Sequence, residues 1–265
     1  MQFENLDAKA FHIFTTASRS GITDYANDFH RLVLAPAGYE SAGPEMIFDS
    51  RAQFARGTRF HVQLGVLQHR ERLALSNLLR RGYSDIEATI HDPPFLTFPY
   101  FQFRSELAMR LSRGFDWYLG SFGLQRRTLE RLRRIFVLSE RGRSALLQWA
   151  PRANVITIPH IVSKDRIWTA QSSLCPALVY FGFIGPNKGL DYALEVHRKL
   201  RVARPGTHLH VVGQASGSGG QRYLDDLRRT YSQDVTFHGY LAEGQLDTLF
   251  ERAAHVILPY TPYKH

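Results

Sequence analysis

The sequence has a single cysteine, no long apolar run and fewer acidic than basic residues, and each shortage excludes a class of protein. Cys175 can form neither a disulfide within the chain nor a cysteine-based metal cluster, so a reducing cytoplasm is the expected compartment. No apolar segment reaches the ~20 residues that a transmembrane helix needs, and no signal peptide is expected at the N-terminus. Any contact with a membrane is therefore expected to be peripheral, on its inner face.

Basic residues outnumber acidic ones, and many of them gather in one segment. The chain has 33 Lys and Arg against 24 Asp and Glu, a formal net charge of +9. The stretch from Arg104 to Arg143 is rich in arginine, with aromatic residues such as Phe115 and Trp117 interleaved. This pattern suits a helix on an anionic membrane surface, although a solvated arginine-rich surface has the same composition. Nucleic acid is not an expected partner, because the sequence has no helix-turn-helix, zinc or RNA-binding motif.

Strand-like and helix-like segments alternate along the chain, which predicts an α/β fold with parallel sheets. A hinge is expected at Pro159–Pro176, so we predict two Rossmann-like domains, residues 1–162 and 163–265. In the first domain the expected strands are Phe11–Thr16, Phe60–Leu64, Ile86–Ile90, Ile135–Leu138 and Val155–Ile158. The expected helices are Ile22–Leu34, Arg70–Arg81 and one that is capped by Ser139 and ends at Trp149. The segment that contains Pro36, Gly38, Gly43 and Pro44 is expected to be a loop.

The second domain is predicted to be incomplete. Its expected strands are Leu178–Phe181, His208–Val212, Val235–His238 and His255–Leu258. Its expected helices are Leu190–Leu200, Arg222–Tyr231 and Gln245–Ala253, with Ser216–Gly220 as a flexible connection. Four strands are fewer than the five or six that a doubly wound sheet usually has.

The stretch Leu178–Leu190 (LVYFGFIGPNKGL) is the most informative part of the chain. It joins a strand end, a glycine-containing turn and a helix N-terminus, and open α/β sheets bind anions at such points. Lys188 in the first turn of a helix would oppose the helix dipole by a few tenths to about 1 kcal/mol, unless a bound diphosphate reversed the sign. The alternative is a solvated lysine beside a glycine at the start of a helix.

Several short motifs together resemble retaining glycosyltransferases of family 4, which have the two-domain GT-B fold. The second half contributes FGFIGPNKG at Phe181–Gly189, HVVGQ at His210–Gln214, VTFHGYL at Val235–Leu241 and AAHVILPY at Ala253–Tyr260. The first half contributes SRSGITDY at Ser18–Tyr25, TIHDPP at Thr89–Pro94 and VLSERGR at Val137–Arg143. The likeness extends over nearly the whole chain.

The resemblance implies a hexosyltransferase without a metal or other cofactor. It would move a sugar from a GDP- or UDP-linked donor to a saccharide or to a polyprenyl- or other lipid-linked acceptor, in surface polysaccharide or glycolipid synthesis. The donor would bind mainly to the second domain and the acceptor to the first, with the reaction in the cleft between them. No His, Asp and Glu set has metal-ligand spacing, and His208, His210 and His238 are expected to be structural.

The resemblance also implies roles for individual residues. Lys188 would hold the donor diphosphate and stabilise the leaving group, and His91 would help to position or stabilise the reacting centre. Backbone N–H groups on a loop at Gly21 and Ile22 would face the phosphates. The remaining expected donor-binding residues of the second domain are Gly182, Phe183, Asn187, Gly213, Tyr240, Leu241 and Leu246.

Two departures from the family pattern predict weak or no transferase activity for this chain. Phe183 stands where the family has an arginine, and the E-x7-E element expected after Pro259–Tyr260 is absent. One alternative is a non-catalytic nucleotide-sugar-binding subunit that depends on a partner. Another is a sugar-nucleotide epimerase or dehydrogenase, which the lack of a glycine fingerprint after the first strand makes less favourable.

Overall fold

The chain forms two compact units, Met1–Ser163 and Lys164–His265. The computed structural model describes residues 9–16, 21–49, 51–66, 68–97, 105, 107–108, 111, 121–161, 177–215, 217–231 and 233–259. Most of the expected hinge and the N-terminal part of the arginine-rich segment, with Arg104, Arg110 and Arg113, lie outside these residues. None of the described helices is long and apolar enough to cross a bilayer.

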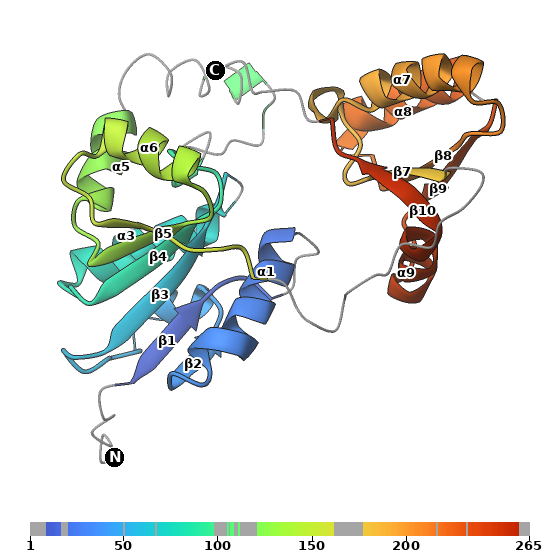
Figure 1. The fold of residues 1–265 in the computed structure, drawn as a ribbon. Coiled ribbons are helices and arrows are strands. Elements are labelled where there is room, and N and C mark those ends of the chain that lie inside the picture. The colour runs from blue at the N-terminus through green and yellow to red at the C-terminus, as the bar shows by residue number, and fades with distance from the viewer. Residues whose placement is uncertain are drawn as a thin grey trace. The chain divides into compact units, whose positions relative to one another are not determined.

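The described part of the first unit is a six-stranded parallel sheet with helices on both faces (Figure 1). The strand order is β2-β1-β3-β4-β5-β6. The strands are β1 (Ala10–Ile13), β2 (Tyr39–Ala42), β3 (Arg59–Leu64), β4 (Ile86–Ile90), β5 (Arg134–Val137) and β6 (Val155–Thr157). The helices are α1 (Gly21–Phe29), the π-helix η1 (His30–Leu34), α2 (Glu45–Phe48), α3 (His69–Arg80), α5 (Ser121–Leu129) and α6 (Glu140–Trp149).

The two faces of this sheet differ in polarity. Because side chains alternate along a strand, Phe60, Val62 and Leu64 of β3 share one face, and they pack with Leu78 of α3 and Leu146 of α6 in the main core. The polar side chains of the same strands lie on the face that α1 covers. As predicted, the Oγ of Ser139 accepts a hydrogen bond from the N–H of Gly142 (3.0 Å), which caps α6.

The second unit is built on a four-stranded parallel sheet with the order β10-β7-β8-β9. The strands are β7 (Ala177–Phe181), β8 (His208–Val212), β9 (Val235–Gly239) and β10 (Ala253–Ile257). The helices are the 3-10 turn η3 (Pro186–Lys188), α7 (Leu190–Ala203), α8 (Gly217–Thr230) and α9 (Glu243–Arg252). In Figure 1 α7 and α8 lie on one side of this sheet and α9 on the other. The larger apolar cluster contains Leu178 and Leu194, and a smaller cluster joins Val179 and Val212 to α9.

Two predicted loops were wrong. The segment with Pro36 and Gly38 contains the short edge strand β2, which pairs with β1 alone, and the helix α2 follows it. The glycines expected to form a flexible connection open α8 instead, because Gly220 packs directly on the backbone of the β7–α7 loop. A Cβ atom on Gly220 would lie 2.8 Å from the carbonyl oxygen of Ile184.

The carboxyl ends of β7 and β8 approach so closely that residue 213 has to be glycine. A Cβ atom on Gly213 would lie 1.8 Å from the carbonyl oxygen of Gly182, and the φ of Gly213 is 149°. The N–H of Gly213 donates to the carbonyl of Gly239 (2.8 Å), so the glycine also ties β8 to β9. Neither the oxygen of Gly182 nor the backbone of Gly213 can move without breaking these contacts.

We therefore predict that Gly213→Ala destabilises the chain. The side chain would collide with a backbone atom in a conformation that favours glycine, so the free energy of unfolding should fall by about 2 kcal/mol or more in urea titrations. Gly219→Ala is the matched control, because Gly219 lies in α8 with nothing within 4 Å of its Cβ position. Alanine there should raise stability by ~0.5–1 kcal/mol. Equal stability of both variants would contradict the packing described here.

Candidate functional site

The carboxyl edge of the second sheet is lined by glycines at three neighbouring strand ends. Gly182 follows β7, Gly213 follows β8 and Gly239 ends β9, and all three have positive φ. Besides the bond from Gly213 to Gly239, the N–H of Gly182 donates to the carbonyl of Val212 (3.0 Å). This edge therefore presents backbone without side chains, and it lets a ligand come close to the main chain.

The loop from Gly182 to Gly189 is anchored at both ends. The N–H of Ile184 donates to the carbonyl of Gln214 (2.8 Å), and Ile184 is buried. At the other end Gly189 has φ 69°, and a Cβ atom there would lie 1.9 Å from the carbonyl oxygen of Pro259. Phe183, which stands where the resemblance leads us to expect an arginine, is 51% exposed.

Lys188 lies in η3 and precedes α7, so it is not in the first turn of the long helix as we expected. The hydroxyl of the buried Tyr180 donates to the carbonyl of Lys188 (3.2 Å), and the N–H of Lys188 donates to the carbonyl of Gly185 (2.9 Å). The backbone of Lys188 is thus fixed from the core side. Lys188 has a cationic side chain and precedes the N-terminus of α7. The positive charge and the helix N-terminus both favour an anion. Asn187 is in the same turn.

Of the three residues expected near the base, two lie in one cluster. Leu241 and Leu246 both pack against the cluster of Val179, Val212 and Ala253. Tyr240 follows β9 and is 63% exposed. The strand ends thus have an apolar margin beside the glycine-lined edge.

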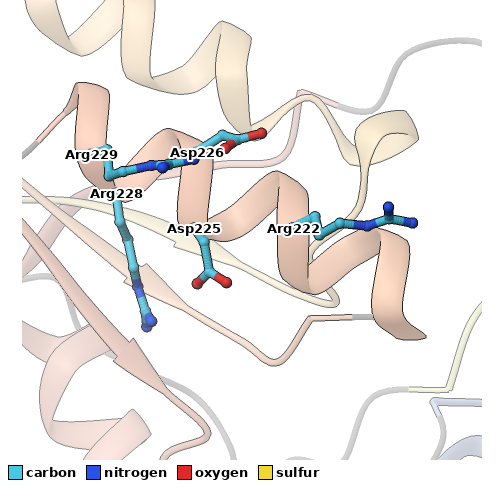
Figure 2. A pocket seen from close by; sticks show the side chains of 5 residues that line it. All are labelled: Arg222, Asp225, Asp226, Arg228 and Arg229. Carbon is cyan, nitrogen blue, oxygen red and sulfur yellow. Dashed lines mark hydrogen bonds and ion pairs between the residues drawn. The ribbon is translucent and has the colours of Figure 1, made fainter.

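A pocket on α8 is separate from this set of residues. Figure 2 shows Arg228 and Asp225 pointing to one side of the helix, while Arg229 and Asp226 lie together on another. Arg229 forms an ion pair with Asp226, and the guanidinium of Arg228 stands over the ring of Phe237 at 5.4 Å. The charge of Arg229 is thus compensated locally, and none of the predicted site residues lines this pocket.

In the first unit His91 directly follows β4, where the sequence predicts it. The N–H of His91 donates to the carbonyl of Leu64 (2.9 Å), and its Nε2 lies 2.9 Å from Oε1 of Gln63. The ring of Tyr25 meets the imidazole edge-on at 4.9 Å. Burial, helped by the nearby His160 and His61, lowers the pKa of His91 to about 4. The side chain is therefore neutral at pH 7.

Gly21 and Ile22 are the first two residues of α1, which agrees with the helix expected to begin at Ile22 and corrects the expectation that the two residues lie on a loop. Their N–H groups belong to the first turn of a helix, where backbone donors have no partner four residues earlier. Ile22 reaches the loop after β3: a Cβ atom on Gly65 would lie 2.5 Å from Cδ1 of Ile22 and 3.1 Å from Oδ2 of Asp92. The start of α1 and the residue after His91 thus meet at Gly65.

Sequence reasoning missed a row of buried polar side chains behind His91. They alternate with apolar residues in three adjacent strands and share the face toward α1: His12 of β1, His61 and Gln63 of β3, and Glu87 and Thr89 of β4. The signal was present in the sequence, since F-H-I, F-H-V-Q-L and I-E-A-T-I each place polar residues at alternate positions. An alternating strand more often has a solvated polar face, but here α1 covers it.

Within this row the histidines are neutral and one acid is charged. Burial lowers the pKa of His12 to about 2, with the neighbouring His61 and His30 acting in the same direction. Burial also lowers the pKa of His61, whose Nε2 lies 2.9 Å from Oγ1 of Thr89. The charged partner of Glu87 is Arg134, whose Nε is 2.7 Å from its carboxylate.

Many of the described arginines of the basic segment serve the fold. Arg133 donates to both carboxylate oxygens of Asp85 (2.6 and 2.7 Å), and Arg131 donates to the carbonyl of Leu79. Arg126 pairs with Glu130 at 3.0 Å. Arg127 and Arg141 are exposed.

The second unit also has histidines close together. Nδ1 of His210 lies 2.9 Å from Nε2 of His238, and Nε2 of His208 lies 2.8 Å from Oγ1 of Thr236. Across the described residues of both units, no three His, Cys, Asp or Glu side chains are grouped so that they could hold a metal ion.

Comparisons with known proteins show which family and which folds this chain is similar to. Residues 175–264 match the family model "Glycosyl transferases group 1", and no curated protein sequence matches the chain. The structure of Anabaena HepE in complex with UDP-glucose is similar with a TM-score of 0.62 and 11% identity, covering 96% of this chain and 74% of that one. An OtsA apo structure is similar with a TM-score of 0.61 and 9% identity, covering 95% and 78%.

A third similar structure, that of TarM, has a TM-score of 0.51 and 13% identity. The chain spans 38% of the length of TarM. At these identities the likeness concerns the fold, and it confirms the predicted class: α/β with Rossmann-like units of the GT-B type. The family match adds that the second unit resembles a glycosyltransferase domain in sequence as well.

We predict that His12 makes the first unit sensitive to acid. The unfolded chain binds a proton at this histidine below its ordinary pKa of about 6.5, whereas the folded chain does so only near pH 2. Stability is therefore retained above pH 6.5 and lost as the pH falls, by about 2 kcal/mol between pH 7 and pH 5 for His12 alone. The measurement is the urea unfolding free energy at both pH values.

The variant His12→Gln should lose that much less stability between pH 7 and pH 5 than the wild type. His255→Gln is the control, because His255 is exposed on β10 and its replacement should leave the pH dependence unchanged. A wild type that is equally stable at both pH values would show that His12 is not buried as a neutral group.

Proposed function

We propose that this chain acts on nucleotide sugars, as a GT-B glycosyltransferase that transfers a hexosyl unit with retention of the anomeric configuration and that has weak or no activity on its own. The proposal is carried by one observation: the part of the chain that matches a glycosyltransferase family is also the part that favours an anion. The segment that matches glycosyl transferases group 1 contains the glycine-lined strand ends and Lys188, the anion-favouring elements of the second unit.

The donor would occupy the carboxyl edge of the second sheet. Its nucleotide would pass close to the backbone at Gly182 and Gly213, and Tyr240, Leu241 and Leu246 would border the base. Lys188, with Asn187 in the same turn, would meet the diphosphate. UDP is the first nucleotide to test, because HepE has been solved in complex with UDP-glucose and with UDP; GDP is the alternative.

During transfer the anomeric carbon of the sugar bonds to the acceptor's hydroxyl oxygen, whose proton passes to the leaving diphosphate. The bond between the sugar and the diphosphate breaks, and negative charge grows on the leaving oxygen. Lys188 would stabilise that charge without a metal ion, since a cation placed in advance costs no reorganisation during the reaction. His91 would act on the sugar, and the first turn of α1 at Gly21 and Ile22 would offer N–H groups to the phosphates. The acceptor would be a saccharide or a lipid-linked saccharide of surface polysaccharide or glycolipid synthesis.

A second candidate is a non-catalytic nucleotide-sugar-binding protein. Phe183 favours it, since an exposed aromatic side chain replaces one of two expected cationic contacts with the diphosphate. Binding of a donor without hydrolysis or transfer would identify this case.

We further propose that the chain works in the cytoplasm at an anionic membrane surface. The exposed Arg127 and Arg141 support this, because each arginine near such a surface contributes about 1 kcal/mol to the binding free energy.

In flotation assays at low salt we expect the chain to rise with vesicles that contain phosphatidylserine and to stay below neutral ones. Reversing both charges (Arg127→Glu with Arg141→Glu) should weaken binding at least tenfold, whereas Lys199→Glu in the second unit should not. Equal flotation with both vesicle types would contradict the proposal that the chain binds an anionic membrane surface.

The donor proposal predicts that Lys188→Ala weakens binding of UDP at least tenfold in isothermal titration calorimetry, equivalent to about 1.4 kcal/mol. The reason is the loss of a charge-assisted contact with the diphosphate. Lys199→Ala is the matched control, because Lys199 belongs to α7, is 72% exposed and pairs only loosely with Glu195 (3.7 Å).

This control should bind UDP within twofold of the wild type. If neither UDP nor GDP binds the full chain, or if both alanine variants bind UDP equally well, the proposed donor site is wrong.

A further inference from the structure

Gln63 connects His91 to a second, deeper histidine. Its Oε1 lies 2.9 Å from Nε2 of His91, and its Nε2 lies 2.9 Å from Nε2 of His12. The three side chains come from the end of β4, from β3 and from β1, three adjacent strands of the first sheet. Gln63 and His12 are both completely buried.

The two ends of a glutamine side chain differ chemically, so the direction in which the Gln63 amide points decides which ring nitrogens carry a hydrogen. An amide oxygen only accepts hydrogen bonds, so Nε2 of His91 has to carry a hydrogen. The amide nitrogen only donates, so Nε2 of His12 has to present a lone pair. Because both histidines are neutral, the hydrogen of His12 is then on Nδ1, and the lone pair of His91 is on Nδ1.

Aromatic rings pack around the bridge and hold the two imidazole rings in place. The rings of Tyr25 and His91 meet edge-on, and Tyr25 stacks on Phe29, which also lies against His12. His30 stacks on His12 with the ring centres 5.5 Å apart, and His61 meets His12 edge-on at 5.4 Å. The titratable groups that face the pair are therefore Tyr25 and His30 from the α1–η1 helix, His61 from β3, and His160, which lies edge-on to Tyr25.

We propose that Gln63 is the positioning residue of His91, and that its amide sets the two histidines in opposite tautomers, with the hydrogen on Nε2 of His91 and on Nδ1 of His12. The role of His91 in sugar transfer rests on the proposed function, whereas the bridge itself does not. Gln63 acts through His91 and does not need to touch the substrate.

The tautomer decides what His91 can recognise. A lone pair on Nδ1 accepts a hydrogen bond and cannot donate one, so this nitrogen suits a hydroxyl group and not a phosphate oxygen. The ligand group that faces Nδ1 of His91 is then a sugar hydroxyl. The diphosphate has to be held by other groups, of which Lys188 is the one already proposed.

The bridge can be tested without any activity. In the full chain labelled with ¹⁵N-histidine, the ¹⁵N shifts at pH 7 distinguish protonated from unprotonated ring nitrogens. We expect hydrogen on Nε2 for His91 and on Nδ1 for His12. The reverse pattern, or the same tautomer in both rings, would overturn the proposal.

Two variants at residue 63 sharpen the test. In Gln63→Glu both ends of the side chain accept, so His12 should move its hydrogen to Nε2 while His91 keeps its own, and the pKa of His91 should rise. In Gln63→Leu, of similar size, His91 should populate both tautomers.

Thr89→Val is the matched control, because it removes the hydrogen bond to His61 from the same buried row without touching the bridge. It should leave His12 and His91 unchanged. If Gln63→Glu leaves the tautomer of His12 unchanged, or if Thr89→Val changes His91 as much as Gln63→Leu does, Gln63 is not the positioning residue.

Measurements of enzyme activity distinguish a failure of the Gln63 proposal from a failure of the proposed function. If the wild type transfers or hydrolyses the sugar of a UDP-linked donor, Gln63→Leu should lower kcat at least tenfold and change KM less than threefold. A variant with unchanged kcat and pH profile would overturn the positioning role. A wild type that shows the expected tautomers but neither binds nor turns over a donor contradicts the proposed function and leaves the bridge intact.

Discussion

The second unit depends on a close approach of two backbones, at which the carbonyl of Gly182 occupies the place of a side chain on residue 213. This contact closes the carboxyl ends of β7 and β8, and the bond from Gly213 to Gly239 extends the closure to β9. The result is a sheet edge of bare main chain beside a loop that holds Lys188. A diphosphate needs backbone access and positive charge in one place, and this edge offers both.

The first unit differs from the second, because it buries polar side chains behind His91, its candidate site residue. One face of its sheet is an ordinary apolar core, and the other holds a row of neutral histidines and their partners under α1. Buried polar groups that find partners rigidify a site, and unpartnered ones are costly. His91 is thus held by its backbone, by the Tyr25 ring and by Gln63 before any ligand arrives.

The sequence was a good guide to the α/β class and to most strands, because segments that alternate apolar and polar residues, such as Val235–His238 and Ile86–Ile90, carry a local strand signal. It misled where glycines serve packing and where a short edge strand depends on its partner strand. The glycines that open α8 allow contact with Ile184, and β2 exists because β1 pairs with it. The alternation that marks the polar row was in the sequence, but the contacts of Gln63 with His12 and His91 were not, since these side chains meet only after three distant strands come into register. Lys188 is a prediction from its motif, and its place before the long helix depends on the φ of Gly189.

The most direct test of the account is a crystal structure of the full chain with UDP. The account predicts density for the diphosphate within hydrogen-bond distance of Nζ of Lys188, with the nucleoside along the backbone at Gly213 and its base against Leu241. Density for UDP elsewhere, for example over the arginines of α8, with the Gly182–Gly189 loop empty, would contradict it.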